Sequence, residues 1–170
     1  LRLMASLMRP TSGSISWNNL DIMDNLSFFR GLLHYVGHHD GIKMALTVEE
    51  NLCFWARINN IGSEEKFVKE ALKKFSLLHI SNLPSRFLSM GQRKRLNLAR
   101  ICTSSAPLWL LDEPLSSLDA DASQTVRNVI STHQDKGGMA VITSHDEPGL
   151  DNKVLNLSSF TNDPEARSNL

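Results

Sequence analysis

The chain has 170 residues, of which 41% are hydrophobic, so it can bury one sizeable core and a single domain is enough to account for it. Its 18 basic and 18 acidic residues cancel, which indicates no global attraction to nucleic acid or to an anionic membrane, although nucleic acid is not excluded as a partner. No stretch approaches the roughly 18 consecutive apolar residues of a membrane-spanning helix, so we expect any membrane attachment to come from a partner.

The start of the chain predicts a helix followed by a small hairpin. Residues 1–8 have the apolar spacing of a helix, and Pro10 and Gly13 mark its end. Residues 14–17 and 20–22 are typical of short strands, and the Asn18-Asn19 pair between them suits a hairpin turn at the edge of a domain.

The middle of the chain predicts two helices. Thr47 and Glu50 form a capping box for a helix that extends to about Ile58. Residues 59–62 then interrupt the pattern before a second helix over residues 64–75. The two cysteines, Cys53 and Cys102, lie in helical patterns and form no metal-ligand cluster, so we expect buried, reduced thiols, which fits a reducing cytoplasm.

A second capping box, formed by Ser89 and Gln92, opens a helix that is predicted to run from Met90 to about Ser105. The free N–H groups of its first turn, the helix dipole and the small Gly91 would favour an anion such as phosphate. The alternative is an ordinary capped surface helix with a solvated basic face. That face would consist of Arg93, Lys94, Arg95 and Arg100, and the expected core positions are Leu96, Ala99 and Cys102.

Residues 108–111 are a short apolar run typical of a buried parallel strand, and Asp112 and Glu113 follow it before Pro114 stops it. Carboxyl ends of parallel strands are where open α/β sheets bind ligands. In phosphoryl transfer, an aspartate there holds Mg²⁺, often through water, and a neighbouring carboxylate can orient or activate the attacking water. Asp112 and Glu113 fit those two roles, and the alternative is a solvated acidic turn.

A helix is predicted over residues 120–134, ending at Gly137-Gly138, and a buried strand follows over residues 139–144. His145 comes directly after that strand and could hydrogen-bond a phosphate or the attacking water, although a single histidine there is more often structural. Residues 158–170 are polar, and we expect a mostly disordered tail.

Taken in this order, the motifs resemble the nucleotide-binding domain of ABC transporters over residues 1–157. Residues 88–92 look like that family's signature motif, residues 108–113 like its Walker B strand, residues 116–119 like its D-loop, and His145 like its switch histidine. The resemblance implies an α/β fold of the ABC-type P-loop NTPase class, with a mostly parallel core sheet. It also implies a helical subdomain, about residues 47–105.

A narrower resemblance lies in residues 35–52, whose Gly-His-x-x-Gly-Ile-Lys pattern is similar to the haem-exporter type of ATPase subunit in bacterial cytochrome c maturation. Most ABC domains carry a glutamine in this Q-loop, whereas His38 stands there in this chain. His38 could accept a hydrogen bond from magnesium-bound water or simply contact the membrane partner. Three aromatic residues either fill the subdomain core or line the groove for that partner: Phe54, Trp55 and Phe67.

The resemblance implies a mechanism in which two domains pack head to tail. Ser89, Gly91 and Gln92 of one domain would meet the γ-phosphate of the ATP bound by the other, and Asp119 would couple the two sites. In each domain Asp112 would position Mg²⁺, Glu113 would polarise water and His145 would stabilise developing charge. The implied cofactors are therefore ATP and Mg²⁺.

The implied partners are a second ATPase subunit and a membrane-spanning, CcmB-like ABC subunit, at the cytoplasmic face of a bacterial inner membrane, with no nucleic acid expected. Alternatives are the ATPase subunit of another exporter, a soluble ABC ATPase acting on ribosomes or DNA, and a non-catalytic remnant that only binds partners. No G-x-x-x-x-G-K-[ST] loop occurs in residues 1–170, so we expect an N-terminally truncated fragment that binds ATP poorly and is inactive by itself.

Overall fold

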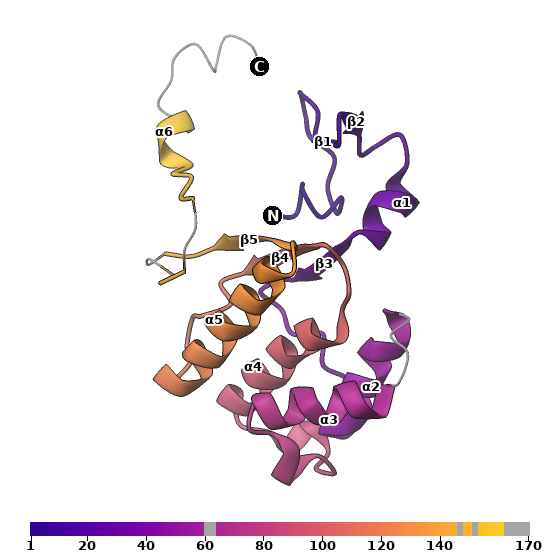
Figure 1. Ribbon diagram of the computed structural model, residues 1–170, viewed down its shortest axis with the longest axis vertical. Coiled ribbons are helices and arrows are strands. Elements are labelled where there is room, and N and C mark those ends of the chain that lie inside the picture. Colours follow the sequence, from indigo (N-terminus) through magenta and orange to yellow (C-terminus); the bar gives the residue numbers. More distant parts are fainter. Residues whose placement is uncertain (60–63, 146–147, 151–152, 162–170) are drawn as a thin grey trace.

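A computed structural model describes residues 1–59, 64–145, 148–150 and 153–161 of the chain. Its centre is a parallel sheet with the strand order β3-β4-β5, shown in the middle of Figure 1. The strands are β3 (Leu33–Val36), β4 (Leu108–Asp112) and β5 (Met139–Thr143). This sheet and the helices around it confirm the predicted α/β class with a parallel core sheet.

Strand β4 lies between the other two strands and is buried on both faces, as its apolar run predicted. Leu108 and Leu110 pack against the N-terminal part of the chain, whereas Trp109 and Leu111 pack against the helices on the opposite face. Figure 1 shows these two layers on either side of the sheet. Strand β5 is only half-buried, unlike the buried strand that was expected, because it lies at the edge of the three described strands.

Residues 1–8 do not form the predicted helix. They make a series of turns, in which the Leu7 N–H donates to the Arg2 carbonyl instead of continuing a helical pattern. Ser6 has a positive φ of 54°, and the Arg30 guanidinium donates to its hydroxyl and carbonyl oxygens at 2.9 Å each. A side chain 24 residues away therefore supports a bend that the local apolar spacing does not reveal.

The predicted hairpin is present at the edge of the molecule. Strands β1 (Ser16–Trp17) and β2 (Leu20–Asp21) pair antiparallel, and both turn residues, Asn18 and Asn19, have positive φ. A short helix that the sequence reading missed, α1 (Leu26–Gly31), follows it and is capped by the Asn25 side chain.

The helical part of the fold agrees closely with the prediction. Both capping boxes are present, at Thr47 with Glu50 and at Ser89 with Gln92. The helix that starts at Met90 is shorter than expected, because it changes to a 3₁₀ turn after Ala99. Residues 60–63, in the predicted break, lie outside the described residues. The elements are α2 (Val48–Ile58), α3 (Glu64–Lys74), η1 (Leu78–Ile80), η2 (Ser85–Phe87), α4 (Met90–Ala99) and η3 (Arg100–Thr103).

Helix α5 (Ala120–Asp135) crosses the sheet on the same side as α2, α3 and α4 (Figure 1), and Gly137 just beyond it has the positive φ of a helix end. At the other end of the chain, α6 (Ser158–Thr161) is a single short turn, and residues 162–170 of the predicted tail lie outside the described part. Within the described residues, none of the helices has the length and apolar character needed to cross a membrane.

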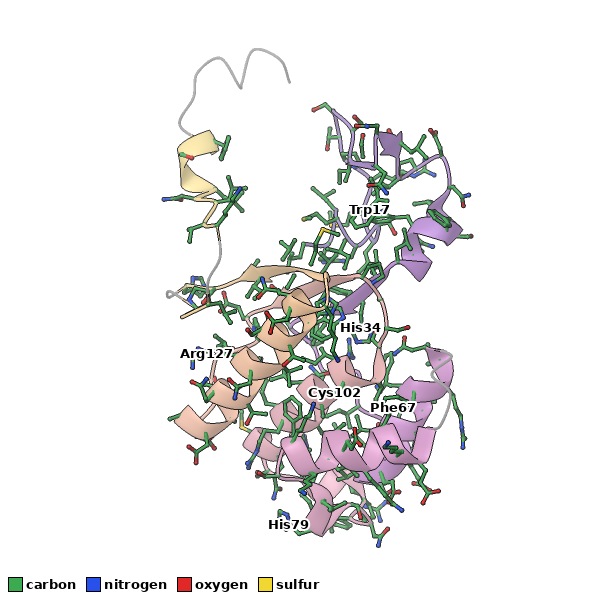
Figure 2. The ribbon with its side chains drawn as sticks, in the orientation of Figure 1. Trp17, His34, Phe67, His79, Cys102 and Arg127 are labelled. Atoms are coloured by element: carbon green, nitrogen blue, oxygen red, sulfur yellow. The ribbon has the colours of Figure 1, made fainter. Side chains whose placement is uncertain are left out.

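Neither cysteine forms a disulfide, as predicted, but both side chains are half-buried rather than fully buried. Burial raises the pKa of the Cys102 thiol to about 11, so this side chain stays protonated at neutral pH and behaves as a packing residue. Among the aromatic residues of α2 and α3, Phe54 and Trp55 are half-buried, whereas Phe67 is 42% exposed on the outer side of α3 (Figure 2).

Candidate functional site

The candidate site lies at the carboxyl edge of the parallel sheet, where β4 and β5 end side by side. Asp112 and Thr143 are register partners on these two strands. The Thr143 hydroxyl donates to Asp112 Oδ1 at 2.7 Å and accepts the N–H of Glu113 at 3.1 Å. One hydroxyl therefore connects both acidic residues and fixes the direction in which the chain leaves β4.

Glu113 has a positive φ of 49°, a conformation that side-chain-bearing residues seldom adopt. Its carbonyl oxygen accepts hydrogen bonds from the Lys94 ammonium and from the Ser116 hydroxyl, both at 2.9 Å. Together with the Thr143 contact, these bonds hold the backbone of Glu113 on both sides of its Cα atom. The carboxylate is therefore presented from a fixed backbone at the strand end.

Lys94 connects this edge to α4. Burial lowers the pKa of its ammonium group, and the negative charges of Glu113 and Asp112 oppose that shift. The ammonium thus supplies a half-buried positive group at the backbone of Glu113, where it interacts with the charges of both carboxylates. In sequence Lys94 looks like one member of a solvated basic face, but in the structure it bonds to the end of β4.

His145 lies on the solvent side of the same edge. Its Nε2 atom is 3.7 Å from Glu113 Oε1, with the histidine side chain 95% exposed and the glutamate side chain 23% exposed. The imidazole is therefore free to contact a ligand that approaches Glu113 from solvent. The structure brings together three residues that the sequence singled out: Asp112, Glu113 and His145.

The start of α4 is open to solvent. The Ser89 hydroxyl accepts the Gln92 N–H at 3.2 Å, and the Gln92 side chain accepts the Ser89 N–H at 2.9 Å. Met90 is 88% exposed, and a Cβ atom placed on Gly91 would meet no other atom within 4 Å. An anionic group could therefore approach these positions closely, with the positive end of the helix dipole behind them.

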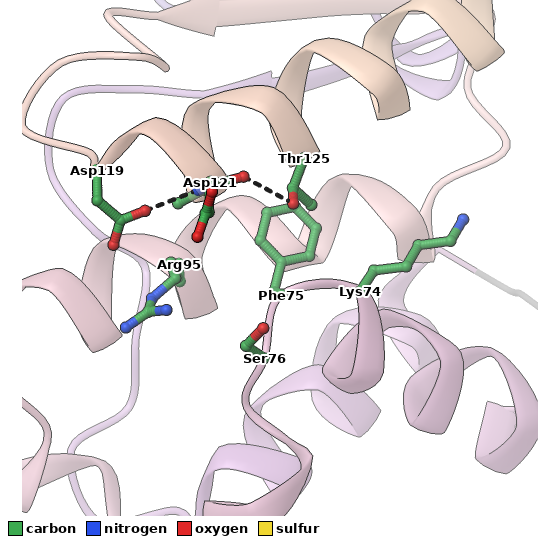
Figure 3. Close-up of a pocket in the computed structure, with 8 residues that line it drawn as sticks. Lys74, Phe75, Ser76, Arg95, Asp119, Asp121 and Thr125 are labelled. Atoms are coloured by element: carbon green, nitrogen blue, oxygen red, sulfur yellow. Dashed lines mark hydrogen bonds between the residues drawn. The ribbon is translucent and has the colours of Figure 1, made fainter.

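Asp119 caps α5, since its Oδ1 atom accepts the Ala122 N–H at 2.7 Å. It also lines a crevice of about 120 Å³, in which Arg95 lies below Asp119 and Asp121, whereas the Lys74 side chain extends away from these carboxylates (Figure 3). The lining of the crevice includes neither Glu113 nor His145. It is therefore a polar gap between α5 and the helical part of the fold, separate from the strand edge.

His38 lies in the loop after β3 and is exposed, with its ring edge-on to that of His39 at 5.6 Å between centroids. Within the described residues, no hydrogen bond or ion pair joins His38 to Asp112 or Glu113. The loop starts at the same edge of the sheet, because β3 runs parallel to β4. The structure thus places His38 at the edge but leaves its side chain free for a ligand or partner.

Oxygen ligands dominate the strand edge. The Asp112 and Glu113 carboxylates and the Thr143 hydroxyl suit a hard cation such as Mg²⁺, which binds through one or two carboxylates and keeps several waters. In the described part of the chain, His, Cys, Asp and Glu side chains form no group of three or more that could hold a metal ion by themselves. The residues present therefore fit an ion that is shared with phosphate oxygens and water.

Three comparisons with known proteins agree with one another. The ABC transporter family profile matches residues 1–116. Two curated relatives are both named cytochrome c biogenesis ATP-binding export protein CcmA. The protein from Rhodospirillum rubrum is 40% identical over 173 residues, covering 100% of this chain and 72% of its own length. The protein from Paramagnetospirillum magneticum is 38% identical over 165 residues, covering 94% of this chain and 75% of its own length.

Solved structures give the same fold. A dimeric ATP-binding cassette in a post-hydrolysis state, bound to ADP and Pi, matches with a TM-score of 0.73 at 24% identity. The match covers 85% of this chain and 68% of that chain. This similarity concerns the fold alone, and it places the sheet, α5 and the helical part in a known arrangement.

Proposed function

The chain belongs to the ABC transporter family, as an ATP-hydrolysing ATP-binding protein of the CcmA type, and we propose that it drives a membrane complex in c-type cytochrome biogenesis. The observation that carries this proposal is the cluster at the sheet edge. There, one hydroxyl links Asp112 to the backbone of Glu113, and His145 lies 3.7 Å from the Glu113 carboxylate. The cluster brings together a carboxylate that can hold hydrated Mg²⁺, a carboxylate that can activate water and an imidazole, which supports nucleotide hydrolysis at this edge.

Glu113 is the residue that we assign to the attacking water. Its carboxylate accepts a proton or a hydrogen bond from that water and so increases the nucleophilicity of the oxygen. His145, exposed above it, donates a hydrogen bond to the developing negative charge. Asp112 would hold Mg²⁺, through water, and the bound ion would neutralise charge on the phosphate oxygens. Thr143 holds the Asp112 carboxylate, and Thr143 and Lys94 together hold the backbone of Glu113.

A complete site needs a second subunit. Ser89, Gly91 and Gln92 lie at the open start of α4, and we assign them to the γ-phosphate of ATP that the partner subunit holds. Asp119, at the start of α5, would couple the two sites across the interface. This homodimer is supported by the exposure of Met90 and by the open space at Gly91, which a facing ligand would fill.

The membrane partner that we propose is a CcmB-like spanning subunit at the cytoplasmic face of the inner membrane. The surface available to it includes the exposed His38 and, beside it in the chain, Lys43, whose ammonium lies 4.6 Å from the centre of the Phe54 ring. The exposed apolar side chain of Met44, which follows Lys43 in the chain, suits a protein partner. The complex either exports haem or uses ATP to release haem from a carrier.

The test is the substitution Glu113→Gln in the full-length protein, purified with its membrane subunit. Because an amide cannot accept the proton of the attacking water, we expect ATP binding to persist, turnover to fall by at least about 100-fold, and ATP-bound dimers to accumulate on gel filtration. The matched control is Glu65→Gln, which alters an exposed glutamate paired with Lys69 on α3. Undiminished turnover in Glu113→Gln would contradict the assigned role.

A further inference from the structure

Arg100 is a buried cation at the junction between α4 and the sheet. It is the first residue of η3, directly after α4, and is only 6% exposed. One guanidinium nitrogen, Nη2, donates to the Tyr35 carbonyl at the end of β3, and Nη1 donates to Asn97 Oδ1 at 3.2 Å. The guanidinium also lies over the Trp55 ring, 4.4 Å from its centre. Three separate elements therefore meet at this side chain.

Burying the charge of Arg100 is costly, which indicates that its contacts have a specific role. Burial lowers the pKa of Arg100 to about 10, and the charge of Asp40 opposes that shift, so the side chain stays charged at neutral pH. Its Nε atom is buried and has no hydrogen-bond partner. An apolar residue would avoid both costs, so these contacts are maintained despite a local penalty.

The His38 loop, defined here as Gly37–Lys43, is also attached to the cluster around Arg100, through the second half of the loop. The Gly41 N–H donates to Asn97 Oδ1 at 3.4 Å, the atom that also accepts from Arg100. A Cβ atom on Gly41 would lie 2.7 Å from Arg100 Nη1 and 2.8 Å from the Trp55 ring. The loop backbone therefore packs directly on the guanidinium, and only glycine fits there without a shift.

A second buried polar residue secures the end of the loop. Asn51 on α2 accepts the Lys43 N–H at 2.8 Å and donates to the Lys43 carbonyl at 3.1 Å and to the Ser85 hydroxyl at 2.9 Å. Between these anchors His38 and His39 are exposed. The loop is thus fixed at Gly41 and Lys43, and the strand that precedes it is fixed at Tyr35, with the exposed tip between them presented to solvent.

We infer that Arg100 is a positioning residue that attaches the His38 loop to the end of α4, so that the position of His38 follows the position of this helix, whose start is capped by Ser89. Arg100 is buried against Asn97, Tyr35 and Trp55, so its influence passes through these neighbours. It acts through the Tyr35 carbonyl on one side of the loop and through Asn97 and Gly41 on the other. A rotation of α4 would therefore move the loop tip with it, which links the start of α4 to the surface assigned to the membrane partner.

The link between the loop and the membrane partner rests on the proposed function, whereas the attachment of the loop to Arg100 does not. The first measurement therefore concerns the loop alone. In Arg100→Lys, the charge is kept but the planar fork and its stacking on Trp55 are lost. By hydrogen–deuterium exchange of the full-length protein, we expect peptides from the His38 loop to exchange about tenfold faster. Peptides from β4 should exchange as in the wild type.

The matched control is Arg30→Lys, because Arg30 also donates two hydrogen bonds to backbone and hydroxyl oxygens, but at Ser6, among the N-terminal turns. It should leave exchange of the His38 loop unchanged. Arg100→Lys could also accelerate exchange in β4 as much as in the loop, and in that case Gly41→Ala becomes the deciding variant. Its control is Gly31→Ala, because a Cβ atom on Gly31 would meet no atom within 4 Å. Unchanged loop exchange in Gly41→Ala would then overturn the inference.

Asn97 gives a test of the shared acceptor. Asn97→Asp keeps an oxygen for both donors and should preserve loop protection, whereas Asn97→Leu removes it and should match Arg100→Lys. Because Asn97→Leu and Arg100→Lys break the same hydrogen-bond network, the double variant should exchange in the loop no faster than either single variant. Additive effects on loop exchange would contradict a single attachment point.

The second measurement is ATP turnover with and without the membrane subunit. In Arg100→Lys, we expect KM for ATP to stay within twofold, while stimulation by the membrane subunit falls at least fivefold. A loosened loop with full stimulation would overturn the positioning role and leave the ATPase assignment standing. Wild-type protein that neither hydrolyses ATP nor responds to the subunit would instead contradict the proposed function, whatever the exchange data show.

Discussion

Thr143 and Asp112 end neighbouring parallel strands, and the Thr143 hydroxyl donates to the Asp112 carboxylate at 2.7 Å. The same hydroxyl accepts the N–H of Glu113 at 3.1 Å. Since a hydroxyl has one proton and two lone pairs, this side chain uses its donor on one acidic residue and an acceptor on the next. Thr143 therefore fixes the Asp112 carboxylate and the backbone of Glu113 with a single hydroxyl.

Thr143→Val should reduce turnover while leaving the shape of the strand end unchanged. The valine removes both hydrogen bonds, so Asp112 loses a donor and the Glu113 N–H is left unpaired, at a cost of about 1–3 kcal/mol in unfolding free energy. Loss of such an orienting partner typically lowers activity about 10–100-fold. Steady-state ATP turnover of the membrane complex measures this. Thr143→Ser keeps the hydroxyl and should stay within about threefold of the wild type, so equal losses in both variants would contradict the role.

Ser89→Asp should separate the capping role of Ser89 from its proposed contact with phosphate. Aspartate caps helices as well as serine does, so the unfolding free energy should change by less than about 0.5 kcal/mol. Its negative charge would stand where the γ-phosphate is expected to approach, so turnover should fall at least about 100-fold. Urea unfolding and ATP turnover of the same preparation give the two values.

The capping box of α2, formed by Thr47 and Glu50, supplies the control for this experiment. Thr47→Ala and Ser89→Ala should each lose about 1 kcal/mol of unfolding free energy, because each removes an N-cap acceptor. Only Ser89→Ala should also lose turnover. A loss of turnover in Thr47→Ala as large as in Ser89→Ala would show that helix stability, and not phosphate contact, limits activity.

Features that depend on residues close in sequence could be predicted. A capping box needs only positions i and i+3, which is why the helices starting at Val48 and Met90 were found at the correct residue. The buried strand at Leu108–Asp112 follows from its apolar run alone. The order of Asp112, Glu113 and His145 at one edge follows from parallel pairing, which places all strand ends together.

Features that depend on distant residues could not be predicted. Thr143 lies 31 positions from Asp112, and Lys94 lies 19 positions from Glu113. Neither contact has a local sequence pattern, and both require the packing of α4 and β5 against β4. The turns of residues 1–8 are a similar case, since the apolar spacing of a helix is present but the Arg30 contacts at Ser6 stabilise a bend.

Among the described residues, His34 is a buried group whose titration opposes the folded state. It is 5% exposed, lies opposite Trp109 in the register of β3 and β4, and its Nε2 atom has no hydrogen-bond partner (Figure 2). Burial, assisted by the charge of Arg100, lowers its pKa to about 3, against 6.5 for an ordinary histidine. The folded protein therefore holds His34 neutral while the unfolded chain can protonate it.

The stability of the protein should consequently fall as pH decreases from 6.5 towards 3. In this window the unfolded state binds one more proton than the folded state at His34, and this raises the unfolding constant about tenfold per pH unit. Between pH 7.5 and pH 5, we expect a contribution of about thirtyfold from this residue alone. Urea unfolding at both pH values measures the total, and His34→Gln should remove this part of it. His79→Gln, which alters an exposed histidine, should leave the pH dependence of the wild type unchanged. An equal pH dependence in the wild type and both variants would show that protonating His34 does not destabilise the folded state.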